Sequence, residues 1–155
     1  MKIRILLIFL LLSSFVFAQN DEENIKNTIH QLFEGMKTGD SALVKKTFHP
    51  EVKMQTIFTN KEGLTKLHDE KLENFLKAIG TPHDGIWNEK ITFTSIQIDE
   101  HLAHVWTDYQ FYLDDQFIHC GVNSFQLVKL NEQWQIVHLI DTRRKMNCNE
   151  KEFNR

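Results

Sequence analysis

Apolar residues recur at helical spacing in the part of the chain that follows an apolar leader. Their intervals of three and four positions place them on one helix face: Ile25, Ile29, Leu32, Phe33 and Met36. Asp21 can cap the start of this segment, and Gly39 can close its end. The pattern therefore predicts a helix over residues 21–38.

A short second helix and a first strand follow. Asp40 can cap the helix, whose apolar positions are Leu43, Val44 and Phe48. Pro50 ends it, because the proline ring disfavours the helical conformation at His49. Residues 51–58 then alternate, which predicts a strand with one face formed by Val52, Met54, Thr56 and Phe58.

The next segment carries the signature of a third helix. Thr59 and Glu62 have the spacing of a capping box, in which the two side chains satisfy backbone donors at a helix start. Apolar residues again recur at helical intervals before Gly80: Leu64, Leu67, Leu72, Phe75, Leu76 and Ile79. The pattern predicts a helix between Thr59 and Gly80.

The second half of the chain changes from helical spacing to strict alternation. Short polar turns separate the alternating segments: Trp87–Asp99, Leu102–Leu113, Phe117–Leu130 and Gln133–Arg144. In the first of these the alternation slips by one position, which predicts a β-bulge at Ser95. Short turns make consecutive strands antiparallel. The element order is thus helix, helix, strand, helix and then long strands in series.

Residues 1–18 have the layout of a secretory signal peptide. Lys2 and Arg4 precede an apolar run from Ile5 to Leu12, and the small residue Ala18 stands before a polar stretch. The run is too short for a membrane span with a stop-transfer flank. We expect cleavage after Ala18, release into the periplasm or outside the cell, and no membrane association after cleavage.

Processing changes the composition. Of 155 residues 137 remain, and the loss of two of the 18 basic residues leaves 16 against 21 acidic ones, so the net charge moves from −3 to −5. This length suits one domain, which we assign to residues 19–146, followed by a polar tail over 147–155. An acidic balance argues against nucleic acid or an anionic membrane surface as a partner.

Several motifs in the predicted strands together resemble a known family: Val105-Trp106, Tyr109, Phe111-Tyr112, His119-Cys120-Gly121, Phe125-x-Leu127, Trp134-x-Ile136 and Asp141-Thr142-Arg143. They are similar to the NTF2-like superfamily, and within it to the secreted bacterial branch labelled SnoaL-like or lumazine-binding. The resemblance implies an α+β cone, with three N-terminal helices packed on a strongly bent, mostly antiparallel sheet. It also implies a pocket between the concave sheet face and the helices, and a homodimer through the outer face. Because this fold hosts many activities, the resemblance says little about function.

Strand alternation predicts which side chains face this pocket. His119 and Asn123 share a face with Phe125, and His138 shares a face with Trp134. A mainly apolar cavity with a few convergent polar groups is the usual form of a small-molecule site. The predicted ligand-binding residues are Phe58, Tyr109, His119, Asn123, Trp134 and His138. The alternative is that both histidines are simply buried and bonded by neighbouring groups.

An enzymatic interpretation uses the same residues. His119 or His138 is the candidate base, and Tyr109 is the candidate donor to a developing oxyanion. Asp108 or Asp141 would orient the base, but alternation places both aspartates on the outward face unless a bulge intervenes. No acidic residue on the last three strands is therefore predicted to reach the pocket.

The remaining polar candidates are assigned to the pocket rim or to architecture. His49 and His83 lie in loops near the predicted mouth. Asp141 and Arg143 form a structural pair on an end strand, with ligation of a carboxylate or phosphate by Arg143 as the alternative. The histidines lack metal-binding spacing, so we expect no metal and no cofactor.

The chain has two cysteines, Cys120 and Cys148, and an even number in a secreted protein suggests a disulfide. Hairpin geometry opposes the pairing. With a turn at Asn131, Cys120 lies opposite about residue 143, and Cys148 falls roughly 16 Å beyond it unless the tail folds back. Disulfides join Cα atoms less than about 7 Å apart, so the spacing favours a buried, inert Cys120 with the bridge as the alternative.

Three functions follow from the sequence. The first is a binding protein that holds a small, partly aromatic molecule in the cone. The second is an enzyme of proton-transfer, isomerisation, dehydration or hydrolytic type with a pocket histidine as general base. The third is a dimeric interaction module whose outer face carries Trp106 and Tyr112.

Overall fold

The computed structural model describes residues 2–148, with side chains described from residue 20 onward. Its elements in chain order are α1 (Lys2–Thr38), α2 (Ser41–Thr47), β1 (Phe48–Thr59), β2 (Thr65–Glu70), α3 (Leu72–Gly80), β3 (Trp87–Asp99), β4 (Leu102–Leu113), β5 (Gln116–Leu130) and β6 (Gln133–Arg143). The strands form one sheet in the order β2-β1-β6-β5-β4-β3. Only the β1–β6 pair is parallel among these described strands.

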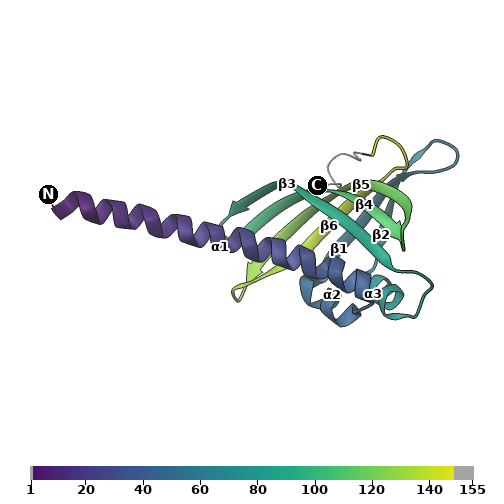
Figure 1. Ribbon diagram of the computed structural model, residues 1–155, viewed down its shortest axis with the longest axis horizontal. Coiled ribbons are helices and arrows are strands. Elements are labelled where there is room, and N and C mark those ends of the chain that lie inside the picture. Colours follow the sequence, from purple (N-terminus) through teal and green to yellow (C-terminus); the bar gives the residue numbers. More distant parts are fainter. Residues whose placement is uncertain (1, 149–155) are drawn as a thin grey trace.

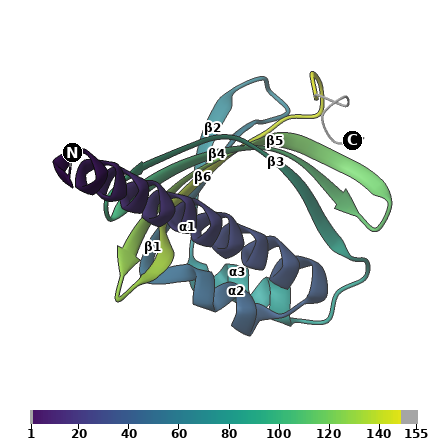
Figure 2. The ribbon, with the colours of Figure 1, turned by 60° about the vertical axis from the view of Figure 1, so that its left-hand side comes forward.

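The sheet curves over the three helices, which cover its concave side (Figure 2). Buried side chains of α1, including Ile25, Ile29 and Leu32, lie there in one hydrophobic cluster with Phe125 and Leu127 of β5. The predicted α+β cone with a strongly bent sheet is thus confirmed.

The first helix begins earlier than predicted, because the leader is helical as well and projects beyond the sheet (Figure 1). Asp21 therefore lies inside α1 and is no cap. Its Oδ1 accepts hydrogen bonds from Trp134 Nε1 at 3.1 Å and from Lys129 Nζ at 3.0 Å. Among the described residues, no helix is long and apolar enough to cross a membrane.

The caps around the second helix follow the sequence. Asp40 Oδ1 accepts from the Leu43 amide at 2.9 Å, as its position before the helix predicts. Gly39 adopts φ +72°, the left-handed conformation that closes α1. These two residues turn the chain sharply, so that α2 packs against α1.

The predicted third helix is wrong over its first half. Residues 65–70 form strand β2, which pairs antiparallel with β1. Asn60 Oδ1 accepts from the amides of Glu62 at 3.0 Å and Leu64 at 2.9 Å, and Gly63 adopts φ +79°, so this segment is a hairpin turn and no capping box forms. The spacing of Leu64 and Leu67 imitates a helix face, but the two side chains are 53% and 59% exposed.

Three bulges interrupt the antiparallel pairing of the described long strands, and the parallel β1–β6 pairing also shifts register between Phe48 and Lys53. The pairing of β3 with β4 skips Thr94, one residue from the predicted position at Ser95. Two more were not predicted: β5 skips Ile118 against β4, and β6 skips Val137 against β5. Each bulge reverses the face on which all later side chains of its strand point.

A disulfide joins Cys120 to Cys148, with Cα atoms 5.8 Å apart, so the expectation of an unpaired Cys120 is wrong. Cys120 pairs with Arg144 across the β5–β6 ladder, as the hairpin geometry implies. The chain then folds back at Asn147, which has φ +56°, and this turn brings Cys148 to Cys120. Residues 149–155 of the predicted tail lie outside the described residues.

Candidate functional site

A cavity of about 810 Å³ lies between the concave face of the sheet and the helices. Most of its wall is apolar, with Leu32, Phe33 and Met36 from α1 and Phe75 from α3. A smaller set of polar side chains faces the same space: Thr56, His68, Glu70, Asn74, Glu89, Tyr109, His119, Asn123, Asp141 and Arg143. The pocket that the family resemblance implies is therefore present, and its polar groups come from separate elements.

The structure brings most of the predicted residues to this wall. Phe58, Tyr109, His119 and Asn123 line the cavity, and their role in binding a ligand stays a prediction. Trp134 does not line it: the indole is 4% exposed in the core, and its Nε1 bonds Asp21.

His138 also lies off the cavity, and the bulge at Val137 is the reason. Without it His138 would share a face with Trp134. With it, Leu139 and Asp141 line the cavity, and His138 points to the opposite face, where its Nε2 lies 3.3 Å from Gln55 Oε1. Because the sequence does not reveal the bulge, strict alternation predicted the wrong sheet face for this histidine.

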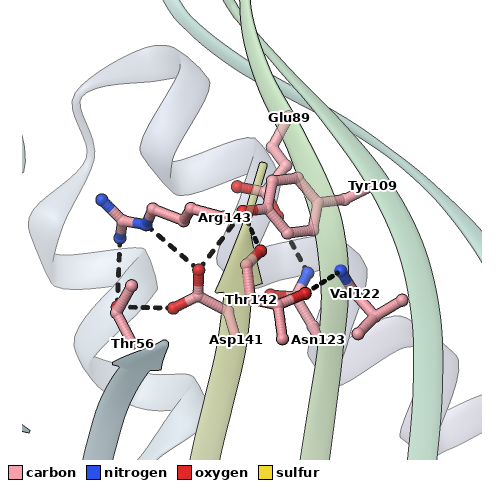
Figure 3. A network of polar contacts seen from close by, with 8 residues as sticks. All are labelled: Thr56, Glu89, Tyr109, Val122, Asn123, Asp141, Thr142 and Arg143. Carbon is pink, nitrogen blue, oxygen red and sulfur yellow. Dashed lines mark hydrogen bonds and ion pairs between the residues drawn. The ribbon is translucent and has the colours of Figure 1, made fainter. Parts of the chain in front are cut away.

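The same bulge turns Asp141 inward, which corrects the prediction that no acidic residue of the last strands reaches the pocket (Figure 3). Asp141 Oδ1 accepts from Thr56 Oγ1 at 2.6 Å, and its Oδ2 accepts from Arg143 Nε at 3.1 Å and from Tyr109 Oη at 3.2 Å. Tyr109 Oη also donates to the Thr142 carbonyl at 2.9 Å, and Arg143 Nη2 donates to Thr56 Oγ1 at 3.3 Å. This network fixes the inner wall between β1, β4 and β6.

The electrostatics of the network follow from its placement. The Asp141 side chain is 13% exposed, whereas Arg143 is 52% exposed and reaches the rim. Burial, together with the charges of Glu89 and Asp141, raises the pKa of Tyr109 far above its ordinary range. The phenol therefore stays protonated and acts as a hydrogen-bond donor.

Glu89 on β3 is a cavity residue that the strand analysis missed. Its Oε1 accepts from Asn123 Nδ2 at 2.9 Å, and that amide lies 3.4 Å from Thr107 Oγ1 (Figure 3). Burial raises the pKa of Glu89 from 4.5 to about 7, and the charge of Asp141 adds to the shift. The signal was present, because Glu89 shares strand parity with the apolar Ile91.

His119 is held between aromatic rings on the cavity wall. Its ring stacks on Phe111 with centroids 5.0 Å apart and meets the edge of Tyr109 at 5.7 Å. Burial and the nearby Arg143 charge lower the pKa of His119 to about 4. The imidazole is therefore neutral near pH 7, able to donate or accept a hydrogen bond and weak as a base.

The two rim candidates occupy different positions. His83 is exposed and stacks on Trp87, which lines the cavity, with centroids 4.4 Å apart. His49 is not part of the wall, and its Nδ1 accepts from the Glu51 amide at 3.2 Å. In the part of the chain that the structure describes, no group of three or more His, Cys, Asp or Glu side chains is placed to hold a metal ion.

Sequence comparison finds one family. A family model described as "Putative lumazine-binding" matches residues 20–139. No curated protein matches the chain.

Solved structures share the fold at low identity. An NTF2-like protein of unknown function from Shewanella baltica superposes with a TM-score of 0.60 at 16% identity, over 81% of this chain and 94% of that one. An NTF2-like protein with a cystatin-like fold from Novosphingobium aromaticivorans gives 0.67 at 11% identity, over 85% and 87%. A protein described as "Putative Scytalone Dehydratase" from the same species gives 0.65 at 12%, over 82% and 86%.

Proposed function

The chain belongs to the NTF2-like family described as "Putative lumazine-binding", and from that premise we propose that it binds a small, partly aromatic molecule in the cavity. The observation that carries the proposal is a partly open cavity of about 810 Å³ whose mostly apolar wall also carries convergent polar groups from separate elements. Such a space is large enough to admit a bicyclic ligand, and its mixture of apolar and polar groups suits one. The family description makes lumazine, a bicyclic pteridinedione, the first probe.

The cavity offers distinct contacts to such a molecule. Aromatic side chains of Phe58, Trp87 and Phe111 supply flat surfaces against which a ring can pack. Polar groups of Glu89 and Asn123 lie deeper in the wall, while Arg143 stands at the rim. A planar ligand with polar edges satisfies both kinds of surface.

Titration calorimetry with lumazine tests the proposal. Ala78 is an exposed residue of α3 on the cavity wall, so Ala78→Trp partly fills the space without disturbing the core. We expect this variant to lose at least about tenfold in affinity through steric exclusion. Ala42→Trp, at an exposed position of α2 outside the wall, is the matched control.

Native mass spectrometry of protein purified from its own host extends the test to ligands other than lumazine. A retained small molecule that is absent from Ala78→Trp supports the proposal. Lack of any retained molecule, together with lumazine binding that Ala78→Trp does not weaken, would contradict it.

Glu89 favours a second function, an enzyme of proton-transfer type. A carboxyl with a pKa of about 7 in an apolar cavity can take up and return a proton near neutral pH. The histidine bases of the sequence interpretation are less suited, because His138 points away from the cavity and the pKa of His119 is about 4.

Exchange of the α-protons of 2-tetralone in D₂O, followed by NMR, tests this second function. If the protein catalyses exchange, Glu89→Gln should slow it by about 10²–10⁴-fold, whereas His119→Ala should have a smaller effect. Equal rates with wild type and Glu89→Gln would rule out this role for the carboxyl.

We also propose that the outer sheet face joins two copies of the chain. Trp106 on β4 is 39% exposed there, a large apolar side chain at a solvent-facing position. Sedimentation across a dilution series should show Trp106→Ala dissociating at higher concentration than wild type. A dimer indifferent to that change uses another surface.

A further inference from the structure

Glu89 differs from the other carboxylates of the cavity in the side chains that lie near its charge. Asp141 Oδ2 is paired with the Arg143 guanidinium at 3.1 Å. Glu70, on the wall at β2, lies 3.8 Å from His68 Nε2, a contact that is an ion pair only when the imidazole is protonated. Among the described residues no cation lies within ion-pair distance of Glu89, although the nearby Arg143 charge lowers its pKa somewhat against the effect of burial.

One oxygen of Glu89 is directed to the cavity. Asn123 bonds Oε1, and no residue in the described part of the chain bonds Oε2. Every fully buried side-chain oxygen or nitrogen of the described residues has a hydrogen-bond partner. Because Oε2 has none, it is not fully buried, and we take it to be open to the cavity that Glu89 lines. An acceptor in an apolar pocket gains most from a ligand that supplies the missing donor.

Building on the proposed binding function, we propose that the cavity selects heteroaromatic ligands that present an amino group or ring N–H to Glu89 Oε2, and that it discriminates against ligands carrying a carboxylate or phosphate. A protonated or N–H-bearing ring gives Glu89 a charge-assisted hydrogen bond in a poorly hydrated site. The ligand thereby completes a pairing that the protein leaves open.

Anionic ligands are disfavoured by the same arrangement. Arg143 already donates to Asp141 and Thr56, so its charge is largely offset before any ligand arrives. His119 is neutral near pH 7 and adds no positive charge to the wall. A carboxylate that enters meets Glu89 while the cation on the wall, Arg143, is already paired with Asp141, and like charges in such a site repel.

Calorimetric titration with three bicyclic probes of similar size tests the proposal: 2-aminobenzimidazole, indole and 2-naphthoate. We expect 2-aminobenzimidazole to bind the wild type most tightly and 2-naphthoate least. Glu89→Gln keeps the shape and the contact with Asn123 but removes the charge, so it should weaken 2-aminobenzimidazole by about ten- to hundredfold. Glu51→Gln, on the exposed start of β1, is the matched control and should change nothing.

The wild-type protein provides a second measurement that needs no variant. The titratable groups that face the cavity with Glu89 are His68, Glu70, Tyr109, His119, Asp141 and Arg143. With the pKa of Glu89 at about 7, binding of 2-aminobenzimidazole should weaken as the solution is acidified through neutrality, although the probe itself becomes more cationic. Indole binding should not follow that profile.

The outcomes separate this proposal from the binding function on which it rests. If indole binds but Glu89→Gln leaves 2-aminobenzimidazole unchanged, or if 2-naphthoate binds most tightly, the selectivity for N–H donors is refuted and the binding function stands. If none of the probes nor lumazine binds, both proposals are refuted.

Discussion

At the scale of single residues, Glu89 ties the stability of the fold to pH. Its folded pKa of about 7 lies above the ordinary 4.5, so the folded state binds a proton more tightly than the unfolded chain. Stability is greatest when the carboxyl is protonated in both states, falls as the pH rises between these two values, and then levels off. The loss is on the order of 3 kcal/mol.

Glu89→Gln should remove that loss, because the amide carries no charge at any pH. Urea unfolding of both proteins over this pH range checks the prediction. The free energy of unfolding of the wild type minus that of the variant should fall as the pH rises, and the subtraction cancels the contributions of the other titrating groups. Glu51→Gln should keep the wild-type profile. A difference that stays flat with pH would show that Glu89 is solvated as an ordinary carboxylate.

Gly121 makes a different contribution, through the absence of a side chain. A Cβ at this position would overlap the Thr142 carbonyl oxygen and lie 2.8 Å from Tyr109 Cε1. The same carbonyl oxygen accepts the hydrogen bond from the Tyr109 hydroxyl. The close approach of β5 to β6 at Gly121 therefore also positions an acceptor of the polar network.

Gly121→Ala should therefore cost about 2–4 kcal/mol in the free energy of unfolding, because backbone must move to admit the methyl group. Gly63→Ala is the comparison: its Cβ would meet nothing within 4 Å, and only its φ of +79° opposes the change, at about 1–2 kcal/mol. Equal losses in the two variants, measured by urea unfolding, would contradict this account.

At the scale of elements, the disulfide fastens the end of β6 to β5. Cys120 and Cys148 are separated by 28 positions, and loop-closure entropy gives such a cross-link about 3–4 kcal/mol of stabilisation. It closes on the strand segment that carries Asp141 and Arg143, and so it supports the cavity wall.

Cys148→Ser should lower the free energy of unfolding by about 2–4 kcal/mol. Reduced wild type should then unfold at the same urea concentration as the variant, and the variant should be insensitive to reductant. A stability unchanged by reduction would mean that the bridge does not constrain the unfolded chain.

The elements also show where periodicity misleads. Leu64 and Leu67 stand three positions apart on an edge strand, and nothing in their spacing separates that from a helix face. Asn60 and Gly63 were the better guide, since their conformations define the hairpin turn. The spacing in α1 was confirmed because those residues pack in the core. In α2 it was confirmed for Val44, whereas Phe48 is buried as the first residue of β1.

At the scale of the whole molecule, the contacts of Asp21 indicate whether the folded domain needs the leader, residues 1–18. Asp21 joins α1 to Trp134 and Lys129 at the β5–β6 turn, and these contacts lie after the expected cleavage point at Ala18. Although burial opposes ionisation, the hydrogen bonds from Lys129 and Trp134 lower the pKa of Asp21. We propose that the mature domain retains this attachment.

A chain that begins at Gln19 should therefore match the full chain in urea unfolding within about 0.5 kcal/mol. The intact mass of protein exported by its host should equal that of residues 19–155. An uncleaved mass, or a loss of stability well above that margin, would contradict the assignment of residues 1–18 as a leader.

The amino-acid sequence by itself determined the element types where spacing is strong, the bend near Ser95 and the apolar character of the cone, because burial on one face imposes a local period. Only the tertiary structure decided which side chains of β6 face the cavity after Val137, since the bulge there cannot be recognised in the pattern of apolar and polar residues. That one residue moved His138 out of the cavity and Asp141 into it. The pairing of Glu89 with Asn123, across 34 positions of sequence, likewise arises only when β3 curves over the helices and desolvates a carboxyl that the sequence shows as one charge among many.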